Sequence, residues 1–76
     1  MTPHNLLLCC ASVVANANRL RKEAIDRGDQ AQVDAMLGRA DAIYLLAAML
    51  GLGTQSVHDL ATVEEERLKR VIRKVA

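Results

Sequence analysis

The chain has 76 residues, of which 51% are hydrophobic and 25% are charged, with a formal net charge of +1. This composition excludes a disordered chain, and the near-neutral charge excludes a global field that would recruit nucleic acid or an anionic membrane. A domain of this size buries only about 60% of the surface of its unfolded chain, so its core is marginal unless a partner adds to it. With one Tyr and no Phe or Trp, the core must be aliphatic, which favours close-packed helices. We predict one all-α domain over residues 1–76.

The first segment has clear signals for the start and the end of a helix. Thr2 before Pro3 is typical of a helix start, and nothing interrupts the segment until Gly28, so we expect a helix over residues 3–27. The apolar run over residues 6–15 is not preceded by Lys or Arg, which a secretory signal normally carries. We therefore expect a cytoplasmic protein.

Two further helical regions follow. Asp29 is a typical first cap of the second helix, which we expect over residues 30–50, and Gln32 completes a capping box. The last helical region carries a second capping box at Thr62 and Glu65. This leaves two alternatives, one continuous last helix or a break near Thr62, and therefore three or four helices in total.

The first two helices each carry a heptad seam, a row of small and large apolar residues at alternating spacings of three and four. Such seams pack helices at shallow angles, and alternating sizes let antiparallel helices approach closely. Over residues 6–50 this layering resembles the Rop-type helical hairpin, a dimeric four-helix bundle. The seam residues are Leu6, Cys10, Val13, Ala17, Leu20 and Ala24 on the first helix, and Val33, Met36, Ala40, Ile43, Ala47 and Leu50 on the second.

The open end of the predicted hairpin has more apolar surface than one more helix can cover, because both stretches there are apolar around the whole helix. We expect a homodimer, or a partner's helix laid against this surface. The alternative is a monomer completed by the last helix. The predicted interface consists of Leu7, Val14, Leu37, Tyr44, Leu45 and Met49. Tyr44 is the favoured anchor because amphipathic aromatics are typical of interfaces, and the alternative is a tyrosine at the edge of the intramolecular core.

We find no catalytic, cofactor-binding or metal-binding pattern. His4 and His58 have no carboxylate or cysteine at the spacing of a metal site, and no glycine-rich phosphate loop is present. Cys9 and Cys10 are adjacent, which does not match the spacing of a zinc site. We expect both to be reduced, and the alternative is an intermolecular disulfide across a symmetric dimer. We therefore do not expect an enzyme.

One segment indicates a different partner. Over residues 46–60 the chain resembles the helix-turn-helix of bacterial repressors, with Ala47 where two helices cross, Gly51 in the turn and Val57 as a locking residue. The resemblance implies DNA binding, with Gln55 and His58 facing bases. The phosphate contacts would come from a basic cluster at the end of the chain, which contains Arg67, Arg70, Arg73 and Lys74.

We favour the protein-binding interpretation, because the helix that would read DNA contains no Lys or Arg and presents Asp59. The expected function is a small non-enzymatic regulatory or inhibitory module, by analogy with the compact helical inhibitors that phages and plasmids encode. The alternative is a DNA-binding transcriptional regulator.

Overall fold

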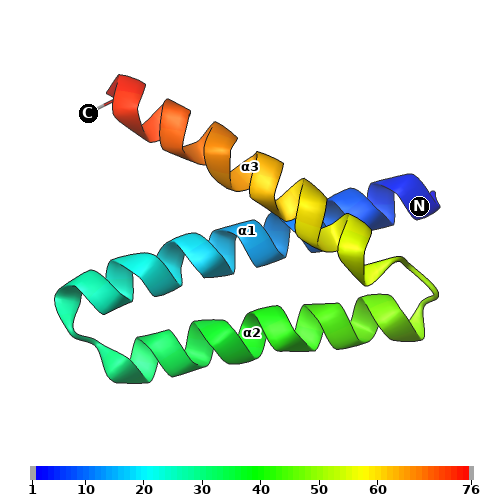
Figure 1. Cartoon of the computed structure of the whole chain (residues 1–76), viewed down its shortest axis with the longest axis horizontal. Coiled ribbons are helices and arrows are strands. Elements are labelled where there is room, and N and C mark those ends of the chain that lie inside the picture. The colour runs from blue at the N-terminus through cyan, green and yellow to red at the C-terminus, as the bar shows by residue number, and fades with distance from the viewer. Residues whose placement is uncertain (1, 76) are drawn as a thin grey trace.

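The computed structural model describes residues 2–75, and over them the chain forms three α-helices and no strand (Figure 1). α1 spans Pro3–Arg27, α2 spans Gln30–Met49 and α3 spans Thr54–Val75. The all-helical prediction is therefore confirmed, and the bounds expected for the first two helices are correct to within one residue. Since α3 is continuous, the alternative of a break near Thr62 is wrong.

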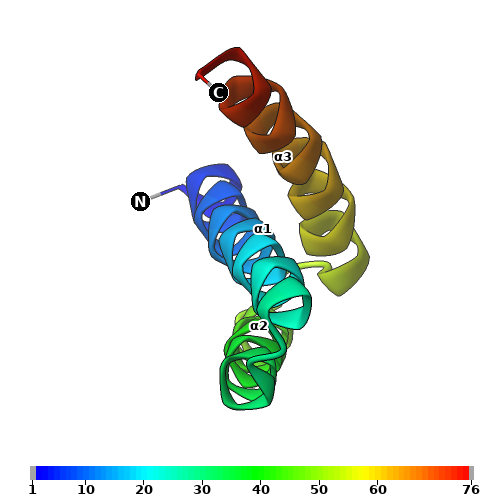
Figure 2. The ribbon, with the colours of Figure 1, turned by 90° about the vertical axis from the view of Figure 1, so that its left-hand side faces the viewer.

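The helices lie side by side, with α1 in the middle, α2 on one side of it and α3 on the other (Figures 1 and 2). α1 and α2 run antiparallel, whereas α3 starts beside the N-terminal half of α1 and diverges from it toward the C-terminus. The principal extents are 36 × 29 × 18 Å, so the bundle is open and flat. α1 contacts both neighbours extensively, and α2 and α3 make few contacts with each other.

Local hydrogen bonds fix the ends of the first two helices. Thr2 Oγ1 accepts a bond from the Asn5 N–H at 3.1 Å, as the N-cap signal predicts. Gly28 has φ of 73°, the left-handed conformation that ends many helices, and the following Asp29 N–H donates to the Ala24 carbonyl at 2.9 Å. The Asp29 side chain in turn accepts from the Gln32 N–H at 3.1 Å. The predicted capping box is thus only half formed, because the Asp29 N–H is already bonded to α1.

The core consists mainly of small side chains. Among the fully buried side chains the largest are two valines, Val14 on α1 and Val57 on α3. Small residues let helix backbones approach closely, which allows helices to pack around a core without Phe or Trp. The contiguous core cluster comprises Cys10, Ala11, Val14, Ala15, Ala17, Ala40, Ala47, Val57 and Ala61.

The structure corrects the predicted seam of α1. Val13 is 38% exposed, whereas its neighbour Val14 is completely buried. The cause is that α1 must face two helices. Asn18 and Lys22 bond to α3, and the buried Ala11 and Ala15 share their helical face, so the apolar surface of α1 extends beyond the stripe that faces α2.

Two other predicted details are also wrong. Leu50, expected as the last residue of the seam on α2, lies after the helix end and is half-exposed. The Thr62 hydroxyl donates to the His58 carbonyl at 3.0 Å, one turn earlier in the same helix. A threonine bonded in this way is an internal helix residue and not a cap, which explains why the Thr62 and Glu65 pair does not start a new helix.

Candidate protein interface

Exposed large apolar side chains occur on all three helices, and the longest consecutive group of them among the described residues lies at the C-terminal end of α2 and directly after it. Leu45 is 64% exposed and Met49 is 76% exposed, and Leu46 and Leu50 beside them are about half-exposed. Side chains of this kind are usually covered in a folded protein, because their burial is the main favourable contribution to folding and association. This end of α2 is therefore the candidate contact surface.

Leu45 and Met49 belong to a longer row on the side of α2 that faces away from α1. The row follows alternating spacings of four and three, so its members share one helical face, and every member is exposed and uncharged. The core residues Met36, Ala40 and Ala47 lie on the opposite face of α2. We call this row the outer seam, and it consists of Ala31, Ala35, Gly38, Ala42, Leu45 and Met49.

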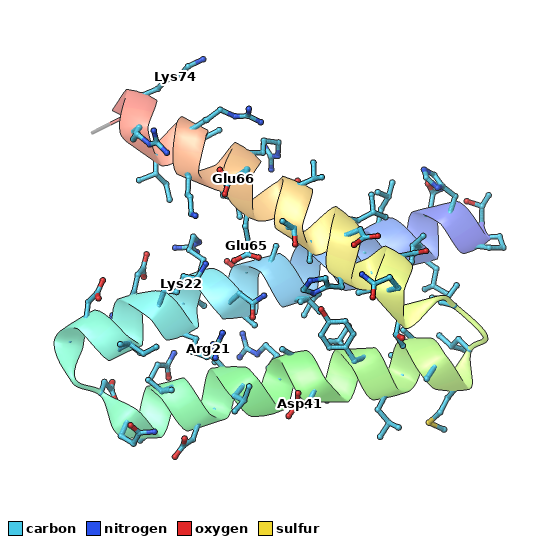
Figure 3. The ribbon with its side chains drawn as sticks, viewed as in Figure 1. Arg21, Lys22, Asp41, Glu65, Glu66 and Lys74 are labelled. Carbon is cyan, nitrogen blue, oxygen red and sulfur yellow. The ribbon has the colours of Figure 1, made fainter. Side chains whose placement is uncertain are left out.

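Charged side chains border the outer seam on both sides. Asp34 and Asp41 follow one edge, and Arg39 lies on the other; Asp41 projects from α2 on the side away from α1 (Figure 3). Within residues 2–75, neither Arg39 nor Asp41 takes part in an ion pair. Asp34 accepts a hydrogen bond from Gln30 Nε2 at 2.9 Å. The outer seam thus has two acidic side chains along one edge and a single arginine along the other.

The predicted interface residues divide into three groups. Leu37, Leu45 and Met49 are exposed, and Leu45 and Met49 fall on the outer seam. Leu7 and Tyr44 are half-buried and pack against the core cluster. Val14 has no exposed surface, so its assignment to a partner-binding surface is wrong. The reason is the position of α3, which covers the α1 face that the sequence left open.

Tyr44 lies where α2 meets α3. Its hydroxyl is 3.3 Å from His58 Nδ1, and its ring packs on the core. Burial raises the pKa of the Tyr44 phenol above its ordinary value, and the negative charge of Glu65 raises it further. In this position Tyr44 joins two helices of one chain, which is the role of an intramolecular edge residue.

This environment has a measurable consequence for the single tyrosine of the chain. We expect its phenolate absorbance to appear at a higher pH than for free tyrosine, whose pKa is about 10. Because the native state disfavours the phenolate, the stability gained is complete below the pKa of the unfolded phenol and is lost as the pH rises through the folded pKa. Glu65→Gln should lower the midpoint only part of the way, since burial remains. A midpoint unchanged from that of the denatured chain would contradict the placement of Tyr44.

The residues expected to read DNA are engaged within the chain. Gln55 Nε2 donates to Asp59 Oδ1 at 2.9 Å, and His58 contacts the Tyr44 hydroxyl. The positions that carry the resemblance to a helix-turn-helix lie together, since Ala47 and Val57 are both fully buried in the core cluster. Gly51 adopts φ of 76° in the connection. However, α3 packs mainly on α1 and hardly on α2.

The basic cluster lies on the C-terminal half of α3. Arg67 Nε donates to Glu64 Oε2 at 2.9 Å, and this bond holds the pKa of the Glu64 carboxyl below its ordinary value. Arg70, Arg73 and Lys74 are exposed, and in the part of the chain that the structure describes they form no ion pair. The positive charge of Arg67 is therefore partly balanced by Glu64. Within residues 2–75, the positive charges of Arg70, Arg73 and Lys74 are not balanced in this way.

A polar contact between helices was not predicted. Glu65 of α3 accepts bonds from Lys22 Nζ at 3.1 Å and from Asn18 Nδ2 at 3.5 Å, both on α1 (Figure 3). The sequence indicated Glu65 only as part of a capping box. The missing signal is the crossing of α3 over α1, which no local pattern contains.

The outer seam was also missed, apart from Leu45 and Met49. Its other members are Ala31, Ala35, Gly38 and Ala42, which are too small to stand out in a hydrophobicity pattern. The signal that could have found them is the heptad spacing of the predicted seam, because the same period repeats on the opposite face of α2.

Comparison with protein-family models, curated proteins and solved structures gave no match to this chain. Among the described residues, no three His, Cys, Asp or Glu side chains are grouped as metal ligands, and no pocket is found. No helix over residues 2–75 combines the length and apolarity needed to cross a membrane.

Proposed function

We propose that this chain is a small non-enzymatic regulatory or inhibitory module that binds protein through the exposed helical surface of α2, as a homodimer. The observation that carries the proposal is the outer seam, a full-length, uncharged row on α2 that ends in the strongly exposed Leu45 and Met49. Covering a Leu or Met side chain contributes about 1.5–3 kcal/mol, so these two residues alone would stabilise a complex substantially.

The small core supports the same conclusion. Because its largest fully buried side chains are Val14 and Val57, the chain gains little free energy from each buried position. Small domains of this kind commonly gain stability by association. A partner helix on the outer seam would add buried leucine and methionine surface without disturbing the face that packs on α1.

DNA binding is the second candidate, favoured by one observation. Ala47 and Val57 are buried in one cluster beside a left-handed Gly51, an arrangement that the helix-turn-helix interpretation requires. Against it, Gln55 and His58 are already bonded within the chain, and Asp59 on the same surface would be repelled by phosphate. The exposed residues of the described chain therefore agree better with protein binding than with DNA binding.

Paired charge substitutions separate the two functions. One variant carries Leu45→Glu and Met49→Glu, and the matched variant carries Arg70→Glu and Lys74→Glu. All four positions are exposed, so circular dichroism should show both variants folded. The tagged chains are used to capture partners from the native host, with and without nuclease and at low and high salt.

We expect the first variant to lose the partner and the second to retain it, with little effect of nuclease or salt on capture by the unmodified chain. Loss of binding in the second variant alone, together with a steep dependence on salt and nuclease, would establish DNA binding instead. The protein-binding proposal also fails if Leu45→Glu with Met49→Glu leaves every interaction unchanged.

A further inference from the structure

We propose that the outer seam of α2 pairs with the outer seam of a second copy of this chain, parallel and in register. This inference rests on the proposed function and specifies the partner of the same surface. The seam has the alternating spacing of a two-stranded coiled coil, with Ala35, Ala42 and Met49 at one kind of core position. Ala31, Gly38 and Leu45 occupy the other kind of core position. Since α1 covers the opposite face of α2, such pairing displaces nothing.

The charged edges identify the occupant as a second copy. In a parallel pair related by a twofold axis, the edge with Asp34 and Asp41 of one chain faces the edge with Arg39 of the other. Asp34 precedes Arg39 by five residues, which is the offset at which flanking charges of parallel helices meet across the interface. The symmetry repeats every contact, so each chain supplies both the acids and the arginine.

The opposite orientation brings like charges together. In an antiparallel pair the two acidic edges lie on one side of the interface and the two Arg39 side chains on the other, because the twofold axis then keeps each edge on its own side. Like charges in facing positions are destabilising. Arg39 has no ion-pair partner within residues 2–75, so it is available to meet Asp34 of the second copy in the parallel pair.

Residue size fits the parallel arrangement as well. The N-terminal two thirds of the seam contain only Ala and Gly, which allow two backbones to approach closely. Outside the surrounding backbone of α2, no atom lies within 4 Å of the Cβ position at Gly38. Leu45 stands at the core position where leucine favours two parallel strands. Met49 then closes the C-terminal end, where its flexible side chain fills irregular space.

Orientation is tested by cross-linking the full chain with Cys9→Ser and Cys10→Ala as the background, which removes the native thiols. In this background Ala35→Cys should form a disulfide-linked dimer on mild oxidation, because equivalent seam residues face each other only in the parallel pair. A mixture of Ala35→Cys and Leu45→Cys chains should give no mixed dimer. Mixed dimers without Ala35→Cys homodimers would show the antiparallel pair and overturn the inference.

Charge reversal provides a second test by light scattering. Arg39→Glu should weaken self-association about tenfold or more, because it turns every attraction across the parallel interface into repulsion. Adding Asp34→Arg and Asp41→Arg to the same chain should restore it. Self-association that is unchanged by Arg39→Glu contradicts the parallel pair. In an antiparallel pair the two side chains at position 39 lie on the same side of the interface, so repulsion between two glutamates merely replaces repulsion between two arginines.

The two proposals fail in different ways. A single-chain mass for the unmodified protein at micromolar concentration overturns the second copy as occupant. The protein-binding part of the proposed function would still hold, without the homodimer, if Leu45→Glu with Met49→Glu abolished capture of a different protein. When neither self-association nor capture depends on these two residues, both proposals fail together.

Discussion

Val14→Asp should unfold the chain at neutral pH. Val14 is completely buried between helices and is one of the two largest fully buried side chains. A carboxylate placed there has no partner, and the effective penalty for such a buried ion is several kcal/mol. A chain of 76 residues has a total stability of roughly 4–11 kcal/mol at the usual value per residue, so this one change removes most of it. Circular dichroism and denaturant titration measure the loss.

The neighbouring residue provides the control. Val13→Asp introduces the same charge one residue earlier, where the side chain is 38% exposed and can reach water. We expect this variant to remain folded and to lose about 1 kcal/mol or less, as is usual for surface substitutions. If Val13→Asp unfolded the chain and Val14→Asp did not, α1 would be rotated by one residue relative to this structure.

Ala61→Leu is expected to have the second largest effect, by forcing α3 away from α1. Ala61 is 1% exposed and belongs to the core cluster that also contains Ala11 and Ala15 of α1. Three added carbon atoms cannot fit between two closely packed helices without moving one of them, and such overpacking typically costs about 1–3 kcal/mol. Because α3 makes few contacts with α2, we expect α3 to detach while α1 and α2 stay paired.

Amide and methyl NMR spectra distinguish this outcome from general unfolding. Signals of Val57 and Leu60 should shift strongly or broaden, and those of Met36 and Ala40 should change little. Thr62→Leu is the matched control, because Thr62 is exposed and its hydroxyl bonds only to its own helix. Equal destabilisation by the two substitutions would mean that α3 does not pack on α1 through Ala61.

The helices themselves could be predicted because their signals are local. Thr2, Gly28 and Asp29 determine the ends through hydrogen bonds within a few residues, and the structure contains these bonds. Local signals of this kind could not predict which of Val13 and Val14 is buried. This depends on how many helices α1 contacts, and that number follows from the path of the chain after Gly51.

The candidate interface was predictable only in part, for a different reason. Large residues such as Leu45 and Met49 indicate a contact surface from the sequence alone, because their exposure is unfavourable in any fold. Tyr44 has equally good chemistry for an interface, yet in the structure it lies against His58 of the same chain. Which apolar residues remain outside is decided by the placement of α3, and the sequence does not reveal where α3 crosses α1.

The central position of α1 also has a consequence for the order of folding. α1 and α2 are joined by a connection of two residues, so their contacts close over short stretches of chain and form at little entropic cost. The contact of Asn18 with Glu65 spans 47 residues, and it brings α3 to α1 only after that longer loop has closed. Short loops close first, so we expect α1 and α2 to pair before α3 docks on them. The surface of α2 that faces away from α1 should therefore be complete before the chain has finished folding.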